Sequence, residues 1–439
     1  MNLRIKKGLD LHLQGAVQAP DAVQVEALQC AIVPDDFPGF QPKVLVREGD
    51  AIEAGAPLMR DKNSPSIALT SPISGKVTAI VRGERRKVLR VVVSNDGKHT
   101  ERTFDTKQPL IELLGASGLL AHLRRRPYDV IVRPEVRPRD IFVTAIDSAP
   151  LSAGMYLPAD AADALAAAVK ALRPLTDGKL YISHRADWPF APVPGAEMVT
   201  VDGPHPAGNV GVQIANIAPV NKGETMWTMD VTTLWRIGRL LLTGKVDYST
   251  LVAVTGPEVN APVMVKTTIG CEIKGILAGR LPNVDHHIRI ISGNVLTGVA
   301  VNEADGFLQA PYRQVTVIAE GDDNVEFMGW ASIAPSKMSA HKALPLRWLR
   351  KLFAPDARIN GGRRAMIFYG EYDRVLPMDI VSEYLLKAII SRNIDDMEAL
   401  GVYEIAPEDF ALCEYIDTSK MPLQQIVRDG LDYLRKELE

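Results

Sequence analysis

Residues 129–134 (DVIVRP), 141–147 (IFVTAID) and 179–184 (KLYISH) decide the fold of this chain. Each is a short run rich in β-branched and aromatic residues, which is typical of a buried strand. Between the second and third runs, an Ala-rich stretch over residues 160–172 predicts a helix. Strands that alternate with helices indicate a parallel sheet covered by helices.

The same pattern continues toward residue 256. Asp230 is a suitable N-cap for a helix with Leu234, Ile237 and Leu241 on its apolar face, and Gly244 is a suitable end. Residues 249–256 (STLVAVTG) predict a further strand of this unit. We therefore expect a Rossmann-like α/β domain over residues 101–257.

The sequence before this unit predicts a small all-β module within residues 1–100. Its strand-like runs, residues 43–50, 55–60, 66–81 and 86–94, are separated by Gly and Pro. Residues 46–50 (VREGD) and 71–77 (SPISGKV) resemble the two hallmark pieces of the biotinyl and lipoyl carrier fold. Lys62 lies on the intervening tip, but outside the setting in which carriers present their modified lysine. We expect the fold without the prosthetic group, and a solvated Lys62.

The second half of the chain predicts two more units. Residues 262–332 are β-rich, with Gly-containing turns, and predict a β-grasp-like domain over residues 258–335. After a connecting segment, residues 336–439 become helical. One expected apolar face carries Ile380, Tyr384, Leu385 and Ile389, and another runs from Leu423 to Leu438.

Composition excludes several classes of protein. The net charge of −3, from 50 basic and 53 acidic residues, argues against a nucleic-acid partner. Cys30, Cys271 and Cys413 are too far apart in sequence to indicate a disulfide framework, which fits a reducing compartment. No run approaches the roughly 18 apolar residues of a membrane-spanning helix, and the N-terminus lacks a secretory signal.

Motifs for independent chemistry are missing from the sequence. It contains no GxGxxG, no GxxxxGK[ST], no GxSxG and no HExxH. Residues 202–208 (DGPHPAG) follow a predicted strand, where an α/β sheet would place a nucleotide, flavin or quinone. His205 could serve there as a proton donor or hydrogen-bond a quinone carbonyl, but a structural role at a domain junction is favoured. The pair His286 and His287 is expected in a surface loop, not at a metal.

Two segments are candidates for docking. Residues 124–126 (RRR), with Tyr128 and Arg133, form the strongest basic concentration, which suits an acidic partner or anionic lipid as well as a solvated helix end. Phe37 and Phe40 on a tight turn suit a quinone or a protein partner, or ordinary core anchoring.

Taken together, the residues resemble the A subunit of the sodium-translocating NADH:quinone reductase, a bacterial respiratory complex of six subunits. The motifs that carry the likeness are residues 5–11 (IKKGLDL), 74–77 (SGKV), 82–83, 85–86, 141–145 (IFVTA), Asp147, 150–151, 202–208, 243–244, 256–257, 259–260, 268–270 (TIG), 291–293 (ISG), 295–298 (VLTG) and 327–330 (FMGW). They are collinear and run through every expected domain.

The resemblance implies a peripheral subunit on the cytoplasmic face of the inner membrane, with a fold related to the flavin-binding subunit of respiratory complex I. It implies a complex that uses flavins, an iron–sulfur cluster, NADH and ubiquinone, while this chain binds no cofactor itself. The implied partners are the other five subunits, especially the integral membrane B subunit, with ubiquinone as a further ligand. Phe37, Phe40, Tyr128, Arg133 and His205 are the proposed quinone or partner contacts.

Two other functions are carried as alternatives. The first is a free-standing carrier or scaffold modified at Lys62, which an intact-mass measurement would detect. The second is an independent nicotinamide enzyme, which the missing phosphate-binding fingerprint disfavours.

Overall fold

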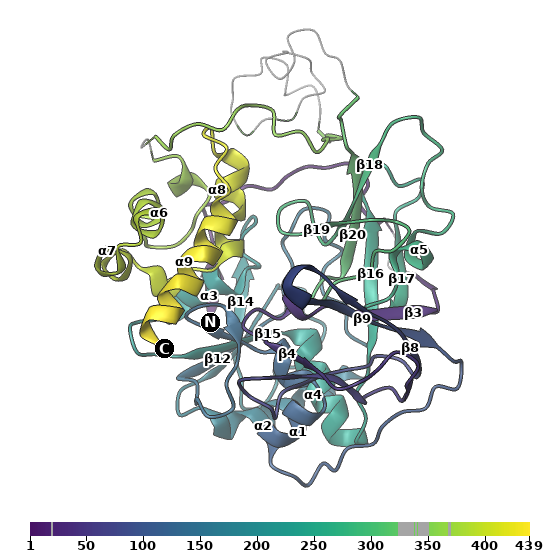
Figure 1. Ribbon diagram of the computed structural model, residues 1–439. Helices are drawn as coiled ribbons and strands as arrows, with labels where there is room; N and C mark the ends of the chain where they lie inside the picture. The colour runs from purple at the N-terminus through teal and green to yellow at the C-terminus, as the bar shows by residue number, and fades with distance from the viewer. Residues whose placement is uncertain (19–20, 324–337, 339, 341–350, 368–369) are drawn as a thin grey trace.

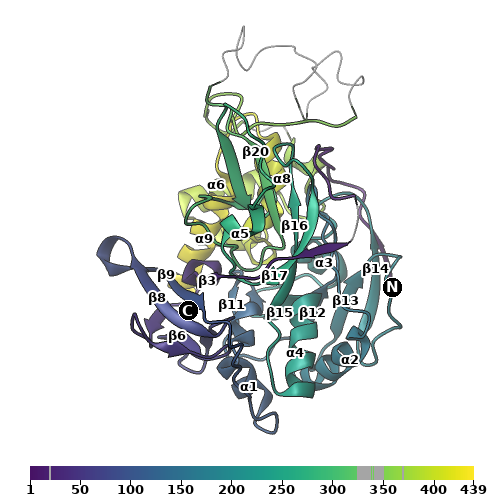
Figure 2. The same ribbon diagram turned by 90° about the vertical axis from the view of Figure 1, so that its right-hand side faces the viewer.

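A computed structural model describes the chain except residues 19–20, 324–337, 339, 341–350 and 368–369. A central α/β unit carries an N-terminal β module, a second sheet and a group of C-terminal helices (Figures 1 and 2). Within the described residues, no helix combines the length and apolar character needed to span a membrane.

The α/β unit contains a seven-stranded sheet. Its strands, in spatial order, are β1 (Asn2–Arg4), β14 (Glu197–Asp202), β13 (Leu180–His184), β12 (Asp140–Thr144), β15 (Met226–Asp230), β10 (Arg124–Arg126) and β11 (Val130–Ile131). The first five are parallel, and the last two add antiparallel pairs at one edge. The sequence prediction of a parallel α/β unit is confirmed for its central strands.

Helices cover both faces of this sheet because its strands are apolar on both sides. Helices α2 (Ala161–Leu172) and α4 (Val231–Thr243) share a core with Ile141 and Val143, whereas α3 (Val210–Ile217) shares the opposite core with Phe142. A Cβ on Gly238 of α4 would lie 1.8 Å from the carbonyl oxygen of Ala164 on α2, so only glycine permits this crossing.

The predicted ends of α4 are confirmed. The Asp230 carboxylate accepts a hydrogen bond from the Thr233 N–H at 2.7 Å, and Gly244 ends the helix in the left-handed conformation with φ 73°.

The N-terminal module consists of two small sheets. One has the order β3 (Gln29–Ile32), β9 (Val88–Asn95), β8 (Gly75–Arg82) and β5 (Ala51–Ile52), and the other has β4 (Pro42–Val44), β6 (Pro57–Asp61) and β7 (Ala68–Thr70). Leu58, Val91 and Val93 lie in the core that this module shares with helix α1 (Leu110–Ala116). Lys62 lies exposed in the β6–β7 hairpin, as predicted.

The second sheet has six strands in the order β19 (Val299–Val301), β18 (Ile288–Ser292), β20 (Gln314–Ala319), β16 (Ser249–Thr255), β17 (Val263–Thr268) and β2 (Ala22–Gln24), with the short helix α5 (Ile273–Leu277) beside it. The assignment of residues 249–256 to the α/β unit is wrong, because β16 pairs with β17 and β20. A strand buried on both faces reads the same in either sheet, so its sequence does not reveal its neighbours.

The C-terminal helices pack on the α3 side of the α/β unit (Figure 1, yellow-green and yellow). They are α6 (Ser382–Ser391), α7 (Ile394–Ala399), α8 (Ala411–Ile416) and α9 (Leu423–Leu438). Leu385 and Leu431 are buried as predicted, but Tyr384 is 57% exposed and Leu438 is also exposed at the end of α9. Short 3-10 helices are η1 (Pro34–Asp36), η2 (Glu84–Arg86), η3 (Leu119–His122), η4 (Arg173–Leu175), η7 (Tyr372–Arg374), η8 (Val402–Glu404) and η9 (Pro407–Phe410).

Two cysteines meet where the N-terminal module joins the second sheet. Cys30 and Cys271 lie opposite each other, flanked by hydrogen bonds from Ala31 N to Gly270 O at 2.9 Å and from Glu272 N to Gln29 O at 3.1 Å. Both thiols are buried and free. The fold thus brings together two residues that are 241 positions apart in sequence.

Candidate functional site

The turn with Phe37 and Phe40 packs against strand β11. The Ile131 N–H donates to the Pro38 carbonyl at 2.8 Å, and the Phe37 ring lies edge-on to His122 at 5.2 Å. Both phenylalanines are buried, which agrees with core anchoring. The small cavity beside Phe37 holds about 20 Å³, less than a quinone ring requires.

Tyr128 and Arg133 lie at either end of β11. Tyr128 is buried, with the Arg125 guanidinium 5.4 Å from its ring centre, and its carbonyl accepts from Arg428 Nη2 at 2.6 Å. The Arg133 side chain is 40% exposed and forms an ion pair with Glu439 at 3.0 Å. Of these four aromatic and basic candidates, Arg133 alone is largely open to a partner.

A group of buried charges joins the α/β unit to the C-terminal helices, and we call it the charge cluster: Arg124, Arg126, Asp129, Glu408 and Asp409. Arg126 is 1% exposed and lies 3.4 Å from Asp409 Oδ2 and 3.2 Å from Glu408 Oε1. Arg124 binds Asp129 Oδ2 at 2.9 Å. Burial alone would raise the pKa of Asp129, but the guanidinium groups of Arg124 and Arg126 outweigh it and lower that pKa.

Both sequence interpretations of residues 124–126 are therefore wrong. They form strand β10, not a helix end, and Arg125 and Arg126 are buried. Arg125 holds the Glu439 carboxylate through two hydrogen bonds of 2.6 Å each. The neutralising carboxylates are about 280 to 310 positions away in sequence, so local charge spacing does not show them.

His205 lies at a different place, where the N-terminal residues cross the α/β unit. Its main-chain N–H donates to Asp10 Oδ1 at 2.9 Å, and its carbonyl accepts from Leu9 N at 2.8 Å. Its ring Nδ1 is 3.0 Å from Ser148 Oγ. The side chain is 4% exposed, and burial lowers its pKa to about 4 although Asp147 and Asp10 act against this. A neutral, enclosed imidazole fits a junction role.

The other histidine candidates point to separate partners. His286 Nε2 is 3.1 Å from Glu258, and His287 Nδ1 is 2.9 Å from Asp322. Across the described part of the chain, no three His, Cys, Asp or Glu side chains gather as metal ligands do.

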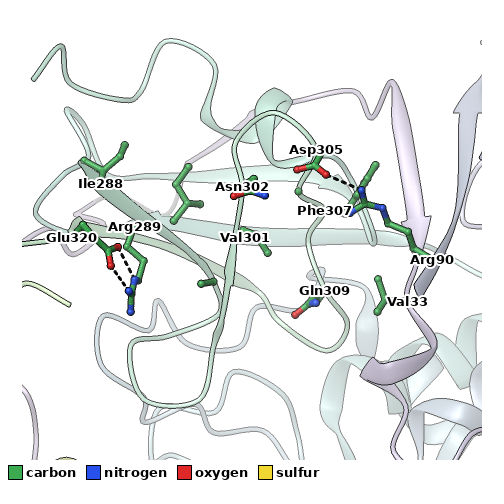
Figure 3. Close-up of a pocket in the computed structure, with 13 residues that line it drawn as sticks. Val33, Arg90, Ile288, Arg289, Val301, Asn302, Asp305, Phe307, Gln309 and Glu320 are labelled. Atoms are coloured by element: carbon green, nitrogen blue, oxygen red, sulfur yellow. Dashed lines mark hydrogen bonds and ion pairs between the residues drawn. The ribbon is translucent and has the colours of Figure 1, made fainter. Parts of the chain in front are cut away.

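A groove of about 440 Å³ lies between the second sheet and the N-terminal module, and the sequence did not reveal it. Figure 3 shows its two arginines, each beside a carboxylate. Arg289 Nε donates to Glu320 Oε2 at 2.8 Å, and Arg90 Nη2 donates to Asp305 Oδ2 at 2.9 Å. Because each cation already has a partner, the groove offers no free charge to a ligand.

Comparison with protein families covers all three sheet-containing regions. Residues 3–96 match the NqrA N-terminal barrel-sandwich hybrid domain, residues 106–246 match the NqrA second alpha/beta domain, and residues 251–303 match the NQRA C-terminal domain. The chain is also 36% identical to the A subunit of the Na(+)-translocating NADH-quinone reductase of Serratia proteamaculans, over 99% of this chain and 100% of that protein. The chain belongs to this NqrA family.

Further members agree. The NqrA proteins of Neisseria meningitidis and Rhodopirellula baltica are 35% and 34% identical over 99% of this chain, covering 100% and 98% of their own lengths. The second family region ends at residue 246, just before β16, in keeping with that strand's place in the second sheet. The motif at residues 327–330 lies outside the described residues.

Proposed function

We propose that this chain acts as the A subunit of a complex that oxidises NADH, reduces ubiquinone to ubiquinol and exports Na⁺, and that it supplies architecture and docking. The full-length likeness to proteins named as the A subunit of the Na(+)-translocating NADH-quinone reductase carries this proposal. The carrier alternative, with a modified Lys62, receives no such support.

We infer that its partners are five further subunits, above all the integral membrane B subunit, at the cytoplasmic face of the inner membrane. A component of a membrane-bound reductase that lacks its own spanning helix would be held by such a partner. Support comes from the described helices, none of which suits a bilayer.

We further propose that the flavins, the iron–sulfur cluster and the NADH and ubiquinone chemistry belong mainly to those partners. An all-cysteine cluster requires four thiolates, and this chain has three cysteines in total. Burial raises the pKa of Cys30 and of Cys413 well above the usual range, which opposes thiolate formation.

The finer description of the fold is also a proposal. We assign a biotinyl- or lipoyl-like module to residues 1–100, a Rossmann-like domain to residues 101–248, a β-grasp-like domain to residues 249–335 and a connecting and helical region to residues 336–439. The boundary predicted at residue 257 moves before β16 because of its pairing.

For contacts, we propose that Arg133 reaches a partner protein or a quinone at its rim. Phe37, Phe40 and Tyr128 would shape the surface beneath it, since they are buried. His205 would act separately, by fixing residues 9–10 on the α/β unit.

A deletion strain tests the proposal. Membranes lacking this chain should lose Na⁺-dependent NADH:ubiquinone reductase activity, and expression of the chain in trans should restore it. Full Na⁺-dependent activity in the deletion strain would contradict the assignment.

A further inference from the structure

A second cavity, of about 390 Å³, lies where α4, the loop after β12 and the second sheet meet. The chain runs from β12 to β13 and β14 on one side, and β15 lies on the other side of β12. Ligands of open α/β sheets bind at such a change of direction, outside the carboxyl ends of the strands. The cavity occupies that position, because its lining includes Asp147 after β12 and Thr232 after β15.

One face of α4 forms a wall of this cavity. Thr232, Trp235, Arg236 and Arg239 line it, and their spacing of three and four residues places them on one side of the helix. The two arginines are thus neighbours of like charge, an arrangement that destabilises a helix unless an anion is near.

Arg236 is 7% exposed, yet it makes no ion pair with a described residue. Its Nε donates to the Asp247 carbonyl at 3.0 Å, and its Nη2 donates to the Ser249 carbonyl at 2.9 Å. Burial lowers its pKa, as expected for a cation that lacks a carboxylate partner. A buried charge without a counter-charge is costly, so an anion bound in the cavity would be stabilised.

Two further cations line the cavity, and neither is paired with a described residue. The side chains of Arg239 and Lys266 make no hydrogen bond or ion pair within the described part of the chain. The fourth cation, Arg313, is already paired with Asp230 at 2.6 Å. The carboxylates in the lining do not compensate the three, because none lies within 4.0 Å of them, and Asp147 accepts instead from Ala149 N at 3.0 Å.

The cavity also has an aromatic wall. Trp235 is 7% exposed, and its indole N–H has no acceptor among the described residues, although buried indole donors usually find one. Tyr156 lines the entrance and is partly exposed. The volume falls within the range of small-molecule sites, roughly 300 to 1,000 Å³.

We propose that this cavity binds an organic phosphate of mononucleotide size, whose phosphate pairs with Arg236, Arg239 and Lys266 while its ring contacts Trp235. Arginine and lysine are the usual phosphate donors in proteins, and an aromatic face suits a planar base. The site is independent of the assembly function proposed above.

The test is titration of the full-length chain with adenosine monophosphate, adenosine and inorganic phosphate, by calorimetry and Trp fluorescence. Adenosine monophosphate should bind saturably, and adenosine should bind at least about tenfold more weakly because it lacks the phosphate. Inorganic phosphate should compete, but more weakly. Equal affinity for adenosine, or for phosphate alone, would overturn the proposed ligand class.

Variants locate the site. Arg239→Gln and Lys266→Gln should each weaken binding of adenosine monophosphate by about tenfold. Lys274→Gln, an exposed charge change on α5 outside the cavity, is the matched control and should leave binding unchanged. Thermal unfolding verifies that each variant is folded. Absence of binding at millimolar ligand, or binding that both cavity variants retain, would overturn the proposal.

Discussion

The α/β unit meets its two neighbours in contrasting ways. Toward the C-terminal helices, the arginines of the charge cluster are buried against carboxylates, as in the 3.4 Å contact of Arg126 with Asp409. Toward the second sheet, Arg236 and Arg239 line a cavity without such partners among the described residues. The same residue type therefore closes one junction and leaves the other ready for an anion. The difference lies in the partner, not in the arginine.

The largest expected effect is at the closed junction. Arg126→Met should lower the free energy of unfolding by about 3–5 kcal/mol, because Asp129 and Asp409 would remain buried without their cation. Urea unfolding of the purified chain measures this change. A loss below about 1 kcal/mol would show that the cluster does not hold the junction.

A third contact, at His205, sharpens the comparison through pH. Its pKa is lowered from 6.5 to about 4, so the unfolded chain binds a proton that the folded chain excludes. Its contribution is fully present above pH 6.5 and is lost as pH falls toward 4, by about 3 kcal/mol. Comparing unfolding free energies of the parent chain and His205→Gln across this range tests it. An unchanged slope in the variant would contradict the assignment.

Gly211 probes how tightly the charge cluster is packed. A Cβ at this position would lie 2.5 Å from Asp409 Oδ2, and that oxygen is held by the Ala406 N–H at 2.9 Å. Gly211→Ala should therefore destabilise the chain by about 2 kcal/mol. Gly362→Ala is a control, since no atom lies within 4 Å of its added carbon. Equal denaturation midpoints for the two variants would show that Asp409 can move freely.

The smallest effect is expected at the open junction. Lys266→Gln should change the free energy of unfolding by less than about 0.5 kcal/mol, because the side chain has no partner to lose among the described residues. The same urea experiment, beside Arg126→Met, gives the contrast directly. A loss comparable to that of Arg126→Met would mean that the two junctions do not differ in this way.

The sequence predicts those parts of the fold that depend on neighbours along the chain. Helix α4 could be placed from Asp230 to Gly244 because its caps and apolar spacing are local signals. The partners of residues 124–126 and the pairing of β16 depend on residues far away in sequence, and no local pattern encodes them. The meeting of Cys30 with Cys271 is of the same kind.

The candidate site was predicted only in part. Phe37, Phe40 and Tyr128 do gather around β11, but they are buried, and the basic residues beside them are largely neutralised. The cavity at α4 was missed because its lining comes from four separate stretches of chain, and Arg236 and Arg239 look like ordinary helix charges. Their spacing of three residues on the face of an otherwise buried helix was the available signal.

The central claim is that this chain supplies architecture to a membrane-bound reductase whose redox centres lie in its partners. Purification of the tagged chain from native membranes in mild detergent tests it most directly, with protein composition and cofactor absorbance measured before and after the chain is separated from its partners. The account predicts co-purification with integral membrane proteins, and flavin and iron absorbance that stays entirely with them. A chain that leaves the membrane alone, or one that keeps a bound flavin or iron centre after separation, would contradict it.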